Sequence, residues 1–162
     1  MFWHSYGKKV LDKIKTEIGN TQLLIKIAYF SDTNMLEKLV TECEPYIAGI
    51  SAINTIPAHC MRKNSEYAFG EKRKKSGISG SVILPAGIKM TKALDKIRYK
   101  HSLSYSIIGI GGVQDYNSYL QYKNAGADVV MSATGSLYNP YLAQEIKNKI
   151  TWFKFIFYFA YF

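Results

Sequence analysis

Short apolar runs alternate along the chain with segments of helical periodicity, and this alternation narrows the fold more than any other feature. Four runs are too short for buried helices and end in polar or glycine-bearing turns, so they are predicted to be strands: residues 23–29, 47–53, 105–110 and 128–133. Strands that are apolar throughout are typical of parallel sheets buried on both faces. One helical segment precedes the first run and one follows each run: 8–18, from 32 or 33 to 45, about 82–99, 115–126 and 139–150.

These helical segments carry their own start and stop signals. Asp32 or Thr33 is expected to cap the second helix, and Pro45 to end it. Pro85 falls in the first turn of the third helix, where proline is tolerated. The fourth helix is expected to end at the glycine of Asn124-Ala-Gly126. Two faces are predicted to be buried: Val10, Leu11, Ile14 and Ile18 in the first helix, and Met35, Leu36, Leu39 and Val40 in the second.

One helix followed by four βα units makes half of an eight-stranded (β/α)8 barrel of the TIM type, although an open doubly wound sheet gives a similar pattern. We therefore expect residues 1–150 to form a half barrel and residues 151–162 to form an aromatic tail without an assigned role. The connection over residues 55–79 is long for a compact domain, and connections of this length are usually functional or disordered.

Composition excludes several classes of protein. Hydrophobic residues make up 48% of the 162 and charged residues 20%, which does not fit a disordered or collagen-like chain. Two cysteines, Cys43 and Cys60, cannot build a disulfide framework, so a reducing, cytoplasmic compartment is expected. No signal peptide or membrane span is predicted, because the best candidate, residues 150–162, contains a lysine and is shorter than the roughly 20 apolar residues that a span needs.

The net charge is 21 − 12 = +9, and part of this excess lies in the run Glu71-Lys-Arg-Lys-Lys75. The run could steer an anionic ligand, although charge runs are usually just solvated. Its aromatic neighbours do not amount to a platform for nucleic acid, so no nucleic-acid partner is expected. His4, His59 and His101 share no ligand spacing, and no metal site is predicted.

Three glycine- or hydroxyl-rich turns follow predicted strands or open predicted helices. Residues 108–113 and 131–135 each end a strand, and residues 76–80 are expected to open the third helix. Backbone N–H groups in such turns can cradle a phosphate, especially at a helix N-terminus. Residues 108–113 and 76–80 could each equally be an ordinary turn, and an ordinary turn or cap is the favoured interpretation of residues 131–135 alone. Three such turns in the same structural context nevertheless favour an anion site. Residues 108–113 do not match the dinucleotide fingerprint, because Gly109, Gly111 and Gly112 lack its third glycine at the required offset.

Polar residues also stand out within one predicted strand and at the end of the next. Lys26 lies inside an apolar strand, which is costly unless the side chain is paired or functional, and an edge strand from which the lysine reaches solvent is the alternative. Asn54 and Thr55 end the next strand, where an amide could bind a planar polar ligand, although a turn-forming Asn is equally plausible.

Taken in order, these residues resemble the C-terminal half of dihydroorotate dehydrogenases. The resemblance covers about residues 20–148, and the ordered set is more specific than any single motif. Other flavin barrels, such as dihydropyrimidine dehydrogenase and dihydrouridine synthase, share parts of it. The matching pieces are Leu24-Ile-Lys26-Ile, Ala52-Ile-Asn54-Thr55, Ser76-Gly-Ile-Ser-Gly80, Ile107-Ile-Gly-Ile-Gly-Gly-Val113, Gly126-Ala-Asp-Val-Val, Ser132-Ala-Thr-Gly and Asn139-Pro-Tyr-Leu-Ala143.

The resemblance implies that FMN lies across the top of the barrel and that Lys26 contacts its isoalloxazine ring, where the ammonium would stabilise negative charge on the reduced flavin. Asn54 and Thr55 would hydrogen-bond the small-molecule substrate, dihydroorotate or a related pyrimidine. The remaining cofactor-binding residues would be Ile53, Ser79, Gly80, Gly111, Gly112, Ala133 and Thr134, with Ala133 contributing its backbone only.

Members of that family pass a hydride from dihydroorotate to the flavin, in pyrimidine biosynthesis, while a Cys or Ser base removes a proton. Neither Cys43 nor Cys60 falls at the matching place, and the family's base belongs to a loop upstream of the matched segment. The resemblance therefore implies half of an enzyme, expected to bind FMN weakly and not to oxidise dihydroorotate by itself. The alternatives are another FMN barrel acting on a pyrimidine, or a non-catalytic half barrel that pairs with a missing half or forms a homo-oligomer.

Overall fold

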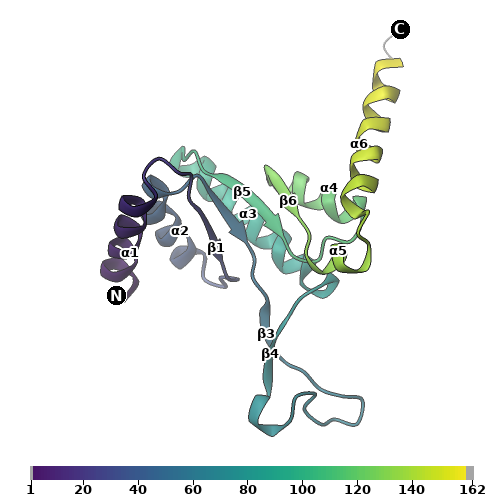
Figure 1. The fold of residues 1–162 in the computed structure, drawn as a ribbon, viewed down its shortest axis with the longest axis horizontal. Coiled ribbons are helices and arrows are strands. Elements are labelled where there is room, and N and C mark those ends of the chain that lie inside the picture. The colour runs from purple at the N-terminus through teal and green to yellow at the C-terminus, as the bar shows by residue number, and fades with distance from the viewer. Residues whose placement is uncertain (1, 160–162) are drawn as a thin grey trace.

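The computed structural model describes the backbone of residues 2–159 and the side chains of residues 7–151. Its main sheet has four parallel strands in the spatial order β1-β2-β5-β6 (Figure 1). Each strand pairs with the next of the four along the chain, and the order never reverses. In a doubly wound sheet the spatial order of the strands reverses at a switch point. The doubly wound alternative is therefore excluded, and the predicted half barrel is confirmed. The strands are β1 (Leu24–Ile27), β2 (Gly49–Ala52), β5 (Ser106–Ile110) and β6 (Val129–Met131).

Five of the six described α-helices fall close to the segments that periodicity predicted, whereas the short α5 was not predicted. α3 begins two residues later than expected and follows a 3-10 turn, and α1 begins before residue 8. The α-helices are α1 (Phe2–Ile18), α2 (Thr33–Cys43), α3 (Leu84–His101), α4 (Tyr116–Asn124), α5 (Thr134–Tyr138) and α6 (Leu142–Phe159), and the 3-10 turns are Glu44–Tyr46, Glu71–Arg73 and Ser81–Ile83.

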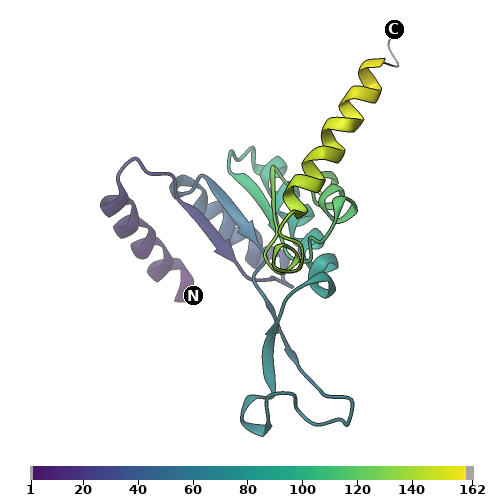
Figure 2. The same ribbon diagram turned by 45° about the vertical axis from the view of Figure 1, so that its right-hand side comes forward.

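One face of the sheet is buried beneath α2 and α3 (Figures 1 and 2). Ile27, Ile50 and Ile107 point to this face from three adjacent strands, and each is at most 7% exposed. They pack with Leu36 of α2 and Leu94 of α3 in one continuous core. Burial of each such side chain contributes about 1.5–3 kcal/mol, so this layer holds the sheet and helices together.

The opposite face of the sheet is open at both of its edge strands. Alternate side chains of a strand point to opposite faces of the sheet. The side chains of Leu24 in β1 and of Val129 and Met131 in β6 point to the face opposite α2 and α3. Their exposed fractions are 58%, 49% and 50%. In a closed barrel this face would be the packed interior, so the half barrel leaves apolar interior positions in contact with solvent.

A capping residue fixes the start of α2. The Asp32 carboxylate accepts the backbone N–H groups of Asn34 and Met35 at 2.9 and 3.3 Å, so the cap is Asp32 rather than Thr33. The predicted burial of Met35 is wrong, since its side chain is 60% exposed. The buried stripe of α2 centres on Leu36, Val40 and Cys43, which leaves Met35 on its solvent side.

The predicted buried face of α1 is buried only in part. Leu11 is buried, but Val10 is 43% exposed, because it lies one residue to the side of the stripe that faces the core.

Asp115 and Ser118 form a capping box at the start of α4, with the Ser118 N–H donating to the Asp115 carboxylate at 2.7 Å. Gly126 has a φ of +99° just past the end of α4, as predicted for a helix stop.

A polar network ties the amino ends of β5 and β6 to α3. The backbone N–H of Ile107 donates to the Asp128 carboxylate at 2.7 Å, and the Arg98 guanidinium pairs with Asp128 and with Asp95. Burial opposes ionisation of Asp128, but the hydrogen bonds from Ile107 and Arg98 outweigh it and hold the pKa of its carboxyl below the usual value.

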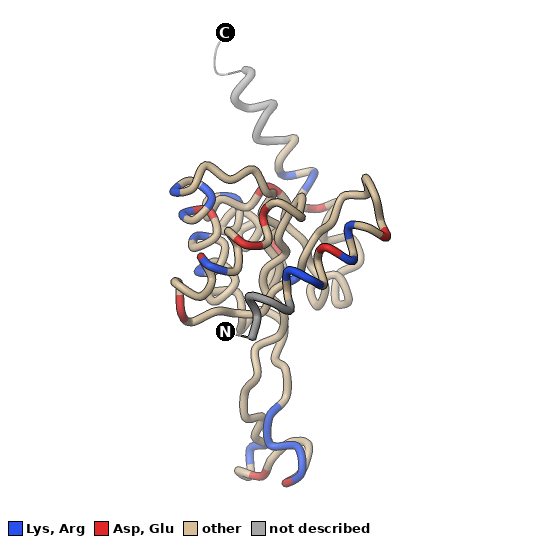
Figure 3. The backbone as a smooth tube through the Cα atoms, turned by 90° about the vertical axis from the view of Figure 1, so that its left-hand side faces the viewer, with Lys and Arg blue, Asp and Glu red and all other residues tan. Residues whose placement is uncertain are grey.

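The long connection forms a hairpin that projects from the body of the domain (Figures 1 and 2). β3 (Ile56–His59) and β4 (Lys75–Ile78) pair antiparallel. The expectation that residues 76–80 open a helix is therefore wrong for 76–78, which continue β4 because they find pairing partners in β3. Lys and Arg residues gather at the tip of the hairpin in Figure 3, where Lys74 and Arg73 stack on Tyr67 and Phe69.

At the C-terminus, helix α6 continues past the predicted end at residue 150 and reaches Phe159. Side chains beyond residue 151 lie outside the described residues, so the division into a domain (1–150) and an aromatic tail (151–162) stays a prediction. Among the described helices, none combines the length and the apolar character that a membrane crossing requires.

Candidate functional site

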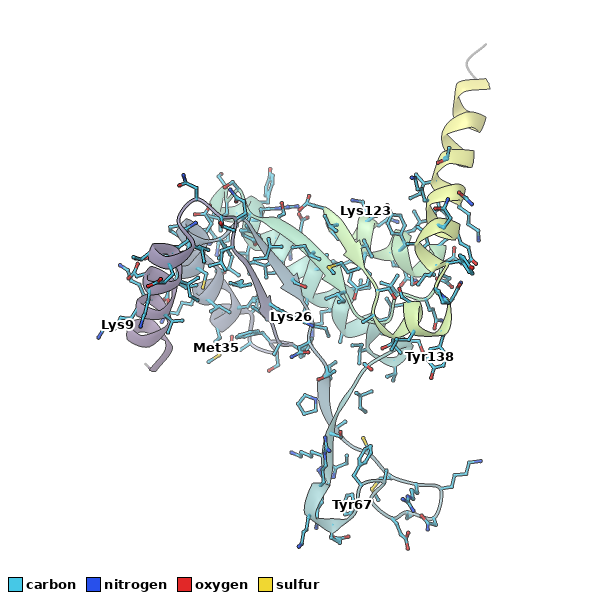
Figure 4. The ribbon with its side chains drawn as sticks, viewed as in Figure 1. Lys9, Lys26, Met35, Tyr67, Lys123 and Tyr138 are labelled. Atoms are coloured by element: carbon cyan, nitrogen blue, oxygen red, sulfur yellow. The ribbon has the colours of Figure 1, made fainter. Side chains whose placement is uncertain are left out.

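The residues singled out by the sequence meet at the carboxyl end of the parallel sheet. Backbone hydrogen bonds join the loops that leave the strands there, from the Ile53 N–H to the Ile110 carbonyl at 2.9 Å and from the Asn54 N–H to the Ile27 carbonyl at 3.1 Å. Figure 4 shows Lys26 at the end of the sheet from which the hairpin leaves, whereas Lys123 lies at the opposite end. In parallel-sheet barrels, ligands bind at the carboxyl ends of the strands.

A glycine turn follows β5 and lies against the first turn of α3. Gly111 and Gly112 have φ values of +124° and +77°, which glycine adopts readily and other residues do not. A Cβ on Gly112 would lie 2.8 Å from the backbone nitrogen of Leu84, where α3 begins. The turn therefore approaches the N-terminus of α3 more closely than any side chain would allow.

Two other loops adjoin this turn. Gly80, with a φ of +86°, precedes the 3-10 turn that leads into α3, and a Cβ at this position would lie 3.6 Å from the Thr134 side chain. The Thr134 hydroxyl donates to the Ser79 hydroxyl at 3.2 Å. The Ser132 hydroxyl donates to the Val113 carbonyl at 2.7 Å and so fastens the loop after β6 to the glycine turn.

The three predicted phosphate loops are thus one cluster in space. Among the described residues, no backbone carbonyl accepts the N–H group of Gly80 or Gly112, and Gly111 directly follows Ile110, the last residue of β5 that pairs with β6. These three glycines are half-buried, whereas Ser79 and Ala133 are exposed. Free N–H groups, two hydroxyls and the N-terminus of α3 form a cradle of the kind that binds a phosphate.

The predicted ring- and substrate-binding residues line the neighbouring strand ends. Lys26 is exposed on the edge strand β1, and among the described side chains no carboxylate pairs with it. Asn54 and Thr55 are exposed after β2, and Thr55 packs against Gly77 of the hairpin, whose Cβ would lie 2.4 Å from the Thr55 hydroxyl. Lys26 is therefore not buried in the sheet, and both its proposed role and simple solvation are compatible with its position.

Ile53 differs from the other predicted site residues because its side chain is 2% exposed and belongs to the core. Only its backbone is available to a ligand. The peptide bond that precedes it, Ala52–Ile53, is cis.

The two cysteines are both free, and burial raises the pKa of the Cys43 thiol, which keeps the thiol protonated. Within the described part of the chain, no three His, Cys, Asp or Glu side chains gather into a metal site.

Sequence reasoning missed Tyr122, which supports the glycine turn from below. Its side chain is fully buried, and its hydroxyl donates to the Gly111 carbonyl at 2.8 Å. A signal was present in the sequence, since glycines interrupt both a strand, at Gly109, and a helix, at Gly87, where glycine is otherwise unfavourable.

Comparisons with known proteins agree with this arrangement. The family model for dihydroorotate dehydrogenase matches residues 6–153. The chain is 30% identical over 131 residues to the dihydroorotate dehydrogenase of Dictyostelium discoideum, covering 80% of this chain and 35% of that protein. It is 29% identical over 144 residues to the dihydroorotate dehydrogenase B (NAD(+)) catalytic subunit of Oceanobacillus iheyensis, covering 89% and 45%.

The dihydroorotate dehydrogenase of Eimeria tenella, solved in complex with ferulenol, is a structural match. It superposes with a TM-score of 0.63 at 18% identity, over 88% of this chain and 40% of that one, and so shows the same fold. The chain thus spans between about a third and a half of the length of these relatives. A family match over most of the chain, with its motifs gathered at one end of a parallel half barrel, shows that this chain belongs to the dihydroorotate dehydrogenase family.

Proposed function

We propose that this chain forms the FMN-binding half of a dihydroorotate dehydrogenase and that the whole protein oxidises dihydroorotate to orotate. The observation that carries the proposal is the single cluster made by the loops after β4, β5 and β6 at the carboxyl end of the sheet. Loops far apart in the sequence supply it, which an isolated glycine turn would not require.

The cradle fits the phosphate of FMN. Gly80 and Gly112 offer N–H groups that have no backbone acceptor among the described residues, and the Thr134 and Ser79 hydroxyls lie beside them. Hydrogen bonds from neutral donors to a charged phosphate are stronger than those between neutral groups. Ser79, Ala133 and Thr134 would contact the adjoining ribityl chain.

The strand ends next to the cradle would receive the ring and the substrate. When bound, FMN supplies a centre that accepts a hydride from the substrate. The Lys26 ammonium would stabilise negative charge on the reduced ring, and the absence of a paired carboxylate among the described side chains leaves it available. Asn54 and Thr55 would hydrogen-bond the pyrimidine substrate, while Ile53 would contribute its backbone.

The open edges of the sheet favour a partner for this half barrel. β1 and β6 each lack a neighbour on one side within the described sheet, and Leu24, Val129 and Met131 are exposed on the face that a closed barrel buries. We propose that these edges pair with the remaining strands of an eight-stranded barrel, from the same or another polypeptide. A cytoplasmic setting is proposed as well, since Cys43 and Cys60 are both free.

Binding of FMN and riboflavin to the 162-residue chain tests the proposal, because the two flavins differ only in the phosphate. Flavin fluorescence titrations are expected to show tighter binding of FMN. Thr134→Val should reduce this preference several-fold, as the loss of one hydrogen bond to a charged group predicts. Thr41→Val is the matched control, since among the described residues the Thr41 hydroxyl bonds only to carbonyls of its own helix, 3.0 Å away. Equal affinities of the wild-type chain for both flavins would refute the proposal.

A further inference from the structure

Tyr122 makes two of its closest contacts with glycines, Gly87 and Gly109. The side chain projects from α4 between the sheet and α3 and has no exposed surface. A Cβ on Gly109 would lie 2.3 Å from a ring carbon of Tyr122, and a Cβ on Gly87 would lie 1.9 Å from its hydroxyl oxygen. Any other residue at either position would collide with the tyrosine.

These two glycines lie in the middle of regular elements, Gly109 in β5 and Gly87 in α3. Glycine weakens the interior of a strand or helix, because it loses more conformational freedom on folding than other residues. The chain therefore accepts a cost in two elements to admit one large buried side chain. A leucine or isoleucine would fill a smaller pocket without that cost, so the hydroxyl is the distinctive part of Tyr122.

The hydroxyl reaches the turn of the proposed phosphate cradle. It donates to the Gly111 carbonyl at 2.8 Å. The Gly111 carbonyl and the Gly112 N–H belong to one planar trans peptide and point in opposite directions. Anchoring the carbonyl toward the buried hydroxyl therefore directs the Gly112 N–H away from the core.

Such an anchor matters because two consecutive glycines are free to rotate. Both have positive φ values, and glycine populates positive and negative φ about equally. Without a fixed carbonyl, the peptide between them could turn and withdraw its N–H from the cradle. Burial raises the pKa of the Tyr122 hydroxyl, so it remains a proton donor throughout the ordinary pH range.

We propose that Tyr122 is a positioning residue that presents the Gly112 N–H to the phosphate of the flavin, an inference that rests on the proposed function. Tyr122 touches neither the flavin nor the substrate in this role. It acts through the peptide that follows Gly111, and it converts a flexible glycine turn into a preorganised donor.

The test compares Tyr122→Phe with Tyr105→Phe. Both substitutions keep the buried ring and remove one hydroxyl bound to a backbone carbonyl, since Tyr105 is 2% exposed and donates to the Leu94 carbonyl at 2.7 Å. Tyr105 lies at the amino end of β5, away from the cradle. The control therefore loses a similar hydrogen bond without changing the glycine turn.

Affinities for FMN and riboflavin are measured for both variants, together with amide hydrogen exchange of Gly111 and Gly112. Tyr122→Phe should bind FMN about 3- to 10-fold more weakly, as expected for one hydrogen bond, with riboflavin affinity unchanged and faster exchange in the turn. Tyr105→Phe should leave the ratio of the two affinities unchanged. Global destabilisation alone would weaken both flavins together and so would overturn the inference.

The two levels of proposal fail differently. If the wild-type chain prefers FMN but Tyr122→Phe keeps the full preference, the positioning role is wrong and the phosphate cradle stands. If the wild-type chain binds both flavins equally, the cradle itself is refuted and the role of Tyr122 falls with it.

Discussion

Gly112→Ala should destabilise the chain more than any alanine substitution at an open turn. An alanine Cβ at this position would lie 2.7 Å from the Leu84 Cβ and 2.8 Å from the Leu84 nitrogen, closer than such atoms approach in real structures. Leu84 begins α3, so its backbone cannot swing aside without moving the helix. Overpacking of this kind costs typically about 1–3 kcal/mol, and the left-handed backbone adds about 1–2 kcal/mol.

Gly70→Ala provides the matched control. Gly70 has a φ of +78° against +77° for Gly112, but a Cβ there would meet no atom within 4 Å. The control should therefore cost only a backbone contribution, about 1–3 kcal/mol, since a φ of +78° with a ψ of 170° lies in a region essentially restricted to glycine. The difference between the two variants, about 1–3 kcal/mol, isolates the collision with α3.

Equilibrium unfolding in urea, followed by circular dichroism, measures both variants against the parent chain. Unchanged slopes would show that the shifts in midpoint report stability alone. If Gly112→Ala and Gly70→Ala lose the same free energy within about 0.5 kcal/mol, the glycine turn and α3 are not rigidly packed, and the close approach inferred for the cradle is wrong.

Three other predictions rest on the same structure. Leu36→Ala should cost about 2–5 kcal/mol in urea unfolding, whereas Met35→Ala, one residue earlier but 60% exposed, should change stability by less than about 0.5 kcal/mol; equal losses would contradict the assigned stripe of α2. Asp128→Ala should cost about 1–3 kcal/mol, because it leaves the Ile107 N–H without its acceptor and removes one of the two carboxylates that pair with Arg98. Glu71→Ala, in contrast, removes an exposed ion pair worth at most about 1 kcal/mol. The hydrogen bonds from the N–H and hydroxyl of Ser118 hold the pKa of the Asp115 carboxyl below its usual 3.8, so the stability that the ionised carboxylate contributes is present above that value and is lost as the pH falls through the lowered pKa. The free energy of unfolding of the parent chain should accordingly fall more between pH 5 and pH 2 than that of Asp115→Asn. Parallel pH profiles would show that the charge of Asp115 does not stabilise the cap.

The sequence by itself determined the four strands of the main sheet, five of the six described α-helices and most of their ends. Strand position follows from local runs of apolar residues, and helix ends follow from local caps such as Asp32, Asp115 and Gly126. Capping groups bond to backbone only two or three residues away, so their effect is already present in the local sequence. The resemblance carried by ordered motifs pointed to the family for the same reason, because each motif is contiguous in the chain.

Only the tertiary structure decided which of these motifs meet, and how. The hairpin depends on pairing between residues 56–59 and 75–78, which local periodicity does not reveal. Lys26 is exposed because β1 lies at the edge of the sheet, and strand order is a property of long-range pairing. Tyr122 reads as an ordinary helical residue until α4 is placed against β5 and α3, and only then do Gly87 and Gly109 become its pocket. Side-chain burial and contact are settled by packing between elements, and packing depends on residues that the local sequence does not contain.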